Sequence, residues 1–414
     1  MISGILKKYY NYTILILLLI FSAFPVLPRA AESIIIILLS SFSLIYFLFE
    51  GKKNWNRSKT IVFFGLSIFF WVYLFTLLYS NNLSYGLNTI KIMLPIVLFP
   101  LIFSINKENL FQSKSINQFI YVYILSLFFY LVYINFFVFK ALFIKDLNFI
   151  QLRYLFEKFT GVHGTYFSIW IGFGVFLILF LVQQNKKNKY FFWGALPILL
   201  YFFYWQNTLA ARMPFIATLL LLIVYLFKGS KKLLFITAIL LIGGFFALSQ
   251  FFFYKERLDR IIKYDFTFPK GEYSTNWPNI SPEHIRNGIY YCSYLKIKES
   301  PLLGYGIGDA DDQLQDCYDC QFTETDTYKI LKYNSHNQYL DIILASGLLG
   351  FLILTFFQFK MIKIAIKNKN SIYLFFLFYF ILDICFENVL HRQDGVMFFS
   401  FFNSILFFQL SNKK

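Results

Sequence analysis

A polar cluster with the groups needed for acid–base chemistry opens an apolar stretch late in the chain. The run NSHNQYLD (residues 334–341) is followed by IILASGLLG (residues 342–350). This pattern predicts a helix with His336 at or near its first turn and Asp341 one to one and a half turns further in. A helix N-terminus disfavours positive charge, and a neutral imidazole can accept a proton as a general base. The alternative is a histidine that only caps the helix.

Arginines form the second group suited to chemistry. Arg212 stands just before Pro214, and Arg260 and Arg286 lie further along in a polar region. The planar guanidinium group binds phosphate oxygens in pairs, so these residues are candidates for holding a phosphorylated substrate. The alternatives are that Arg212 snorkels to a membrane interface and that the other two are salt-bridged or solvated.

The composition requires that these groups be positioned by membrane helices. The chain has 414 residues, of which 58% are hydrophobic and 14% are charged, whereas soluble domains have about 25% charged residues. A helix needs about 20 mostly apolar residues to cross a membrane. The sequence therefore predicts an all-α polytopic membrane protein with about twelve transmembrane helices. They are expected near residues 12–28, 33–49, 61–79, 87–105, 118–139, 166–183, 190–206, 215–227, 233–253, 338–359, 372–388 and 396–411.

The basic residues predict the orientation of these helices. Twenty Lys and Arg residues fall in the short segments on one side, and seven fall in those on the other: Arg29, Lys140, Lys145, Arg153, Lys158, Arg212 and Arg392. The richer side is expected to be cytoplasmic and to hold both termini. The net charge of +16 then reflects topology and anionic lipids rather than nucleic acid, because the charges are scattered over seven segments.

One long connection divides the chain. The expected organisation is helices one to nine over residues 1–253, a large outer loop over 254–335, and helices ten to twelve over 336–414. Within the loop, Ser-Pro-Glu at 281–283 predicts a helix that runs to about residue 298. Residues 146–159 predict an amphipathic helix at the membrane interface.

The same loop contains motifs with more than one interpretation. The run PLLGYGIGD (residues 301–309) predicts a tight turn rather than a dinucleotide fingerprint. The four aspartates between residues 309 and 316 lack the glycine and terminal glutamate of a calcium loop, so no metal site is expected. A disulfide among Cys292, Cys317 and Cys320 is favoured over zinc, with the pairing left open.

The order of these motifs resembles the O-antigen ligase and O-antigen polymerase superfamily of bacterial lipid-linked glycan transferases. The resemblance depends on SHNQYLD (335–341) with GLLG (347–350), on Arg286 with PLLGYG (301–306), and on Ala211-Arg212. The run FENVLHRQDG (386–395) adds to it. It implies a GT-C-like architecture in the bacterial inner membrane, with the active site on the periplasmic face. It also implies metal-independent, inverting transfer of a glycan from undecaprenyl diphosphate to an acceptor hydroxyl, without a cofactor.

The resemblance also implies roles for individual residues. His336 would deprotonate the acceptor, and Arg212 and Arg286 would hold the diphosphate as it leaves. The residues expected to bind substrate are Arg260, His163, Asn337, Asp341 and His391.

The expected function is that of an O-antigen ligase, which joins a glycan to lipid A-core or a similar acceptor in lipopolysaccharide biosynthesis. The alternatives are an O-antigen polymerase that joins lipid-linked repeat units and a protein O-oligosaccharyltransferase. A transporter or lipid flippase is a further alternative, which would favour broken helices, internal repeats and charges near mid-bilayer. In this sequence the polar residues gather at the outer face instead. The sequence does not indicate the sugar, the acceptor or the oligomeric state.

Overall fold

The computed structural model describes residues 2–51, 55–106, 113–145, 149–185, 187–209, 211–226, 282–322 and 331–411, together with the isolated residues 239, 243 and 328. Within these ranges all regular elements are helical and no strand occurs. The predicted all-α class is therefore confirmed for the described part of the chain.

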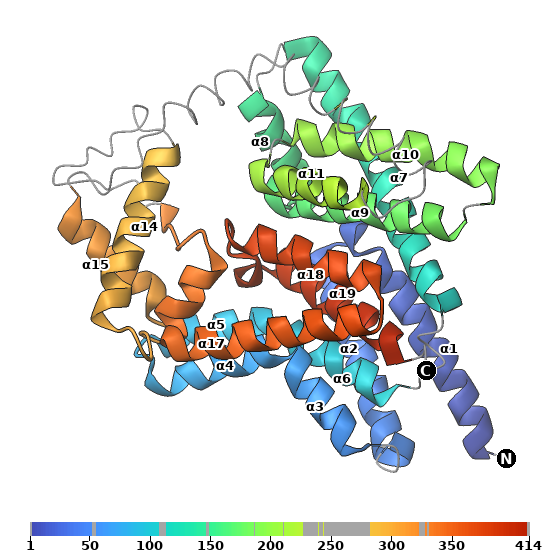
Figure 1. The fold of residues 1–414 in the computed structure, drawn as a ribbon, viewed down its shortest axis with the longest axis horizontal. Coiled ribbons are helices and arrows are strands. Elements are labelled where there is room, and N and C mark those ends of the chain that lie inside the picture. The colour runs from blue at the N-terminus through green and yellow to red at the C-terminus, as the bar shows by residue number, and fades with distance from the viewer. Residues whose placement is uncertain are drawn as a thin grey trace.

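Figure 1 shows the arrangement of the described helices. In chain order they are α1 (Ile2–Ser22), α2 (Arg29–Tyr46), α3 (Arg57–Leu66), α4 (Ile68–Thr76), α5 (Leu83–Met93), α6 (Pro95–Ile105), α7 (Ser113–Lys145), α8 (Phe149–Thr160), α9 (Gly164–Gln184), α10 (Lys189–Thr208), α11 (Arg212–Leu226), α14 (Pro282–Glu299), α15 (Ala310–Gln321), α17 (Gln338–Lys367), α18 (Ser371–Ile384) and α19 (Gln393–Ser411).

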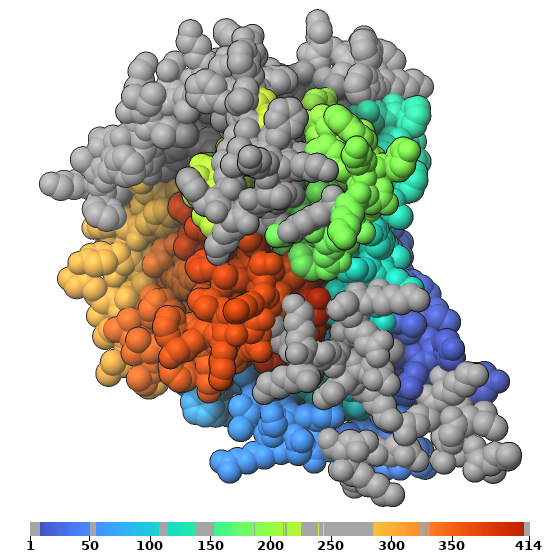
Figure 2. Space-filling view, turned by 45° about the vertical axis from the view of Figure 1, so that its right-hand side comes forward, coloured from blue at the N-terminus to red at the C-terminus, as the bar shows by residue number. Residues whose placement is uncertain are grey.

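The C-terminal helices occupy the middle of the molecule. Helices α17, α18 and α19 lie between the blue helices α3–α6 and the green helices α9–α11, and the same order is visible on the surface (Figures 1 and 2). Helix α9 is apolar on every face and is buried almost throughout, against α7, α10, α11 and α18, as expected for a helix that is hydrophobic all round. Both ends of the described chain lie away from α14 and α15 (Figure 1).

Several described helices suit a membrane, and the chain is a multi-pass membrane protein. Five are long and apolar enough to cross one, or six if the bent pair α3–α4 is a single span. Shorter apolar helices cover Tyr9–Ser22, Met213–Val224 and Ser371–Ile384. Most of the predicted segments coincide with helices of the structure, and the segment at 233–253 lies outside the described residues except for residues 239 and 243. The total of twelve spans remains a prediction.

One segment predicted as a single helix is sharply bent. The segment near 61–79 divides into α3 and α4, which are bent by 66° at Ser67. The segment near 87–105 belongs to one span of membrane length, Leu83–Ile105, in which α5 passes into α6 at Leu94, whose φ of −49° and ψ of −39° are helical. Pro95 lacks an N–H and so removes one backbone hydrogen bond at this point without ending the helical conformation.

Helix α17, predicted as continuous, is also broken, at Gly347. This residue has φ 65° and ψ −171°, a conformation that favours glycine. The glycine-rich turn 301–308 fits against the break, and a Cβ on Gly347 would overlap the carbonyl of Leu302. The N–H groups of Tyr305 and Gly306 donate to the carbonyls of residues 344 and 345, at 2.8 and 2.9 Å. The turn thus satisfies the backbone groups that the break exposes.

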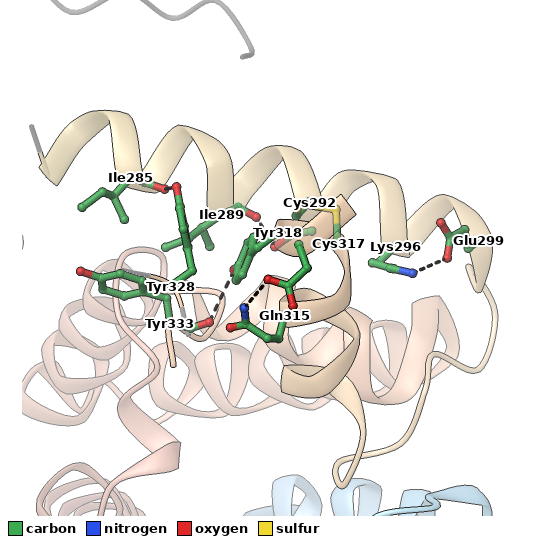
Figure 3. The surroundings of a disulfide bond; sticks show 12 residues. Ile285, Ile289, Cys292, Lys296, Glu299, Gln315, Cys317, Tyr318, Tyr328 and Tyr333 are labelled. Carbon is green, nitrogen blue, oxygen red and sulfur yellow. Dashed lines mark hydrogen bonds and ion pairs between the residues drawn. A yellow bond between two sulfur atoms is a disulfide. The ribbon is translucent and has the colours of Figure 1, made fainter. Parts of the chain in front are cut away.

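The described part of the outer loop is built around one disulfide. Helix α14 spans Pro282–Glu299, which confirms the helix predicted over these residues. Cys292 on α14 is bonded to Cys317 on α15, with their Cα atoms 5.7 Å apart (Figure 3). Cys320 is an exposed free thiol. The structure therefore decides the pairing that the sequence left open.

The acidic residues after the turn bind the loop to the membrane helices. The Asp309 carboxylate accepts the N–H groups of Asn81 and Asn82, each at 2.7 Å. Asp311 accepts a hydrogen bond from the Tyr85 hydroxyl at 2.5 Å. These carboxylates attach the loop to the N-terminus of α5.

Candidate active site

The imidazole of His336 lies at the entrance to α17. The N-cap is Asn337, whose side chain accepts the N–H groups of Tyr339 and Leu340 at 2.9 and 3.2 Å. His336 therefore precedes the cap and does not itself cap the helix. It adopts φ 44°, which is strained for a residue other than glycine, and its N–H donates to Asn334 Oδ1 at 3.1 Å. About a quarter of its side chain is exposed.

The ring of His336 faces a carboxylate that follows α18. His336 Nδ1 lies 3.8 Å from Glu387 Oε1, and Nδ1 is buried without a hydrogen-bond partner among the described residues. Burial by itself raises the pKa of Glu387, but His336, together with the charges of His163 and Arg286, lowers the pKa below its ordinary value. Glu387 therefore stays an anion, and the charges of three residues predicted from the sequence to act at the site favour this state.

His163 occupies the N-cap of α9 beside an ion pair on α8. Arg153 donates to Glu157 at 2.9 Å, and the N–H of Gly164 donates to the same Glu157 oxygen at 2.9 Å. His163 Nε2 lies 3.4 Å from Arg153 Nη2. Burial and then the charge of Arg153 lower the pKa of His163, which keeps the imidazole neutral near pH 7. Helix α8 confirms the helix predicted in this region.

The structure describes the three predicted arginines to different extents. Arg286 lies on the second turn of α14, next to Tyr290, and its charge acts on Glu387. Arg212 is the first residue of α11, but its side chain lies outside the described part. Arg260 also lies outside the described residues. In the described structure His336 lies 3.8 Å from Glu387, and the charges of Arg286 and His163 act on the same carboxylate.

Asp341 and His391 bond to each other in the interior. His391 Nε2 lies 2.9 Å from Asp341 Oδ2, and the two side chains are 8% and 1% exposed. Burial lowers the pKa of His391, but Asp341 and Asp311 more than offset this and raise it to about 9. The imidazole is therefore a cation at neutral pH. With Asn337 at the cap, these three residues are engaged by the protein itself, and their predicted contact with substrate stays a prediction.

Within the described ranges, no three His, Cys, Asp or Glu side chains are grouped so as to hold a metal ion. The carboxylates of Asp309 and Asp311, which lie in the acidic run considered for calcium, are bonded to α5 instead.

Some residues of the site were not predicted from the sequence. Glu387 lies 51 positions after His336, and Tyr73, which bonds to Asp341 at 2.5 Å, lies 268 positions before it. Helical spacing does not report contacts of this range. A weak signal existed for Glu387, because it belongs to the run 386–395 and is an acid at the outer end of an apolar helix.

A comparison with protein families gives an independent result. Residues 194–355 match the family model described as O-antigen ligase (Wzy_C). The match includes Arg212, Arg286 and His336 and ends before Glu387. It confirms the predicted resemblance to the O-antigen ligase and polymerase superfamily. No curated protein matches the chain.

Proposed function

We propose that this chain, whose residues 194–355 are of the O-antigen ligase family, transfers a glycan from undecaprenyl diphosphate to a hydroxyl of lipid A-core or a similar acceptor. The reaction takes place on the periplasmic face of the inner membrane. The observation that carries the proposal is that His336, within the matched region, lies 3.8 Å from the carboxylate of Glu387, on which the charge of Arg286 also acts.

His336 acts as the general base in this proposal. The acceptor oxygen attacks the anomeric carbon and its proton passes to the imidazole, while the bond from that carbon to the diphosphate oxygen breaks. Glu387, an anion 3.8 Å from Nδ1, stabilises the imidazolium that forms. Proton transfer to a positioned base contributes about 10²–10⁴ in rate.

Arg286 neutralises the diphosphate as it leaves, and Arg212 and Arg260 are proposed to share this role. Negative charge grows on the leaving group, so fixed positive charge lowers the barrier most in the transition state. At about 4 Å and an effective dielectric constant near 20, one such contact is on the order of 4 kcal/mol before desolvation. The attack from the side opposite the diphosphate inverts the anomeric centre.

Broken helices also occur in transporters, where the break lines a substrate site. In α17 the break at Gly347 is filled by the turn 301–308, which bonds to the exposed carbonyls. This arrangement supports a rigid transferase scaffold rather than a transport pathway at that position.

The test is transfer in proteoliposomes that contain the purified protein, the lipid-linked glycan and lipid A-core. The ligase produces capped lipid A-core, whereas a polymerase lengthens the lipid-linked glycan. Arg286→Ala should lower kcat by about 10²–10³, and Lys298→Ala, which removes an exposed cation from the same helix, should leave it unchanged. Equal activity of both variants would contradict the proposed role of Arg286, and absence of any glycan product from the wild type would reject the function.

A further inference from the structure

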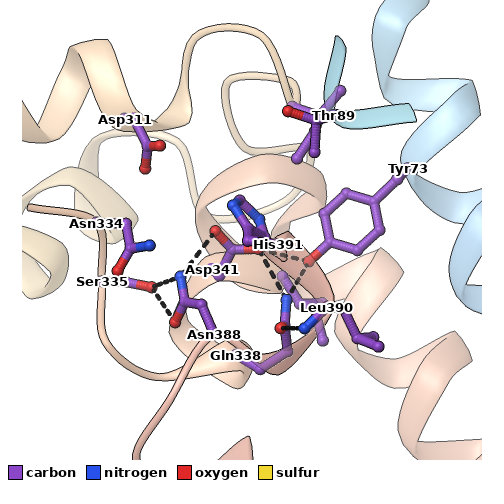
Figure 4. Close-up of polar contacts among 12 residues, drawn as sticks. Tyr73, Thr89, Asp311, Asn334, Ser335, Gln338, Asp341, Asn388, Leu390 and His391 are labelled. Carbon is purple, nitrogen blue, oxygen red and sulfur yellow. Dashed lines mark hydrogen bonds and ion pairs between the residues drawn. The ribbon is translucent and has the colours of Figure 1, made fainter. Parts of the chain in front are cut away.

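A buried network behind the site is not used by the proposed chemistry. At its centre is Asp341, whose Oδ2 accepts the Tyr73 hydroxyl at 2.5 Å and Gln338 Nε2 at 3.1 Å, and lies 2.9 Å from His391 Nε2 (Figure 4). Gln338 also donates to the Tyr73 oxygen at 3.0 Å. The network joins α17 to α4 and to the connection between α18 and α19.

The same network holds residues on both sides of His336 and directly after Glu387. Gln338 Oε1 accepts the N–H of Leu390 at 2.8 Å. Asn388, next to Glu387, donates to Ser335 Oγ at 3.1 Å, and its Nδ2 lies 3.5 Å from Asp341 Oδ1. Ser335 in turn donates to the carbonyl of Asn337 at 3.0 Å. Residues 335, 337 and 388 flank the two groups that face each other in the site.

His336 needs such support because its own backbone is strained. A φ of 44° costs a non-glycine residue on the order of 1 kcal/mol, and it persists only where the surroundings hold it. The bonds of Ser335 and Asn337 are on either side of this residue. The Asp341–His391 pair is therefore placed to hold the imidazole of His336 in position.

We propose that Asp341 and His391 are positioning residues. Their ion pair fixes the connection after α18 next to the N-terminal end of α17. This contact holds His336 Nδ1 facing Glu387. In this role the two residues act through His336, and the substrate contact predicted from the sequence is not part of the proposal. A displacement of about 1 Å at a reacting group can lower the rate about 10²-fold, so a distant pair can control kcat. This inference rests on the proposed role of His336.

The test compares Asp341→Asn, His391→Gln and the double variant in the proteoliposome assay, with rates expressed per folded molecule. Each single variant should lower kcat by about 10- to 100-fold and leave the KM for the lipid-linked donor within about two-fold. The double variant should be no slower than the slower single variant, because the two residues act as one unit. A pair that served only folding would lower the yield and the apparent Tm without changing kcat per folded molecule.

Tyr73→Phe is the variant that keeps the inference testable if the charged substitutions do not fold. It removes one hydroxyl from the network and leaves the ion pair in place, and kcat should fall several-fold. Tyr339→Phe is the matched control, since its hydroxyl bonds to Gln358 instead, at 3.2 Å, and should leave kcat unchanged. If the folded network variants keep the wild-type kcat while His336→Ala is inactive, the positioning role is overturned and the proposed function stands. Activity in His336→Ala would instead reject the proposed function, and the inference with it.

Discussion

The charge of buried His391 gives a prediction about pH. The ordinary pKa of histidine is about 6.5, and the pKa in the folded protein is raised to about 9 by Asp341 and Asp311 against the effect of burial. The folded state therefore keeps a proton that the unfolded state releases. Stabilisation from this group is fully present below about pH 6.5 and is lost as the pH rises through about 9.

The size of the effect follows from the difference between the two pKa values. One unit corresponds to 1.36 kcal/mol, so the wild type should lose about 3 kcal/mol of stability between pH 6.5 and 9.5. Because the group is almost fully buried, solvent screening does not remove most of this energy. Replacing His391 should remove this part of the pH dependence of stability.

The assay is thermal unfolding of the purified protein in detergent, followed by tryptophan fluorescence at pH 6.5, 7.5, 8.5 and 9.5. The wild type should show a falling apparent Tm across this series. His391→Gln should begin lower at pH 6.5 and show a much shallower slope, because no imidazolium is lost on raising the pH. Parallel slopes in the two proteins would contradict the prediction, since the pH dependence would then belong to groups other than His391.

Further predictions concern the outer loop and the break in α17. The disulfide closes a loop with a sequence separation of 25, so Cys292→Ser with Cys317→Ser should cost about 3.5 kcal/mol and lower the apparent Tm. Cys320→Ser should leave the Tm unchanged, and an equal loss in both proteins would contradict the pairing. Gly347→Ala introduces a Cβ at φ 65° against the turn and should cost at least 1–2 kcal/mol. Its control is Gly194→Ala on α10, where no atom lies within 4 Å of the added Cβ. This variant should gain up to about 1 kcal/mol of unfolding free energy. Equal stability of the two variants would argue against the strained break.

The hydrophobic pattern predicted most of the described helices, because each apolar run must be buried in lipid or in protein. The run Ser-Pro-Glu separately predicted the start of α14, because the preferences of these residue types for a helix N-terminus are local. The pattern did not predict the break at Gly347. That break is stable only because a turn forty residues earlier supplies N–H groups to the exposed carbonyls.

The site shows the same difference between features that depend on local sequence and features that depend on packing. His336 and Arg286 were identifiable from local runs and from the family resemblance. The pairing of His336 with Glu387 and that of Asp341 with His391 depend on how the connection between α18 and α19 folds back onto α17. Residue spacing along one helix contains no information about that packing.

The most direct test of the account is the rate of glycan transfer by His336→Ala in proteoliposomes that hold saturating donor and acceptor. The account predicts that kcat falls by about 10²–10⁴, while the amount of folded protein and the donor KM stay close to those of the wild type. Transfer at the wild-type rate by folded His336→Ala would contradict it.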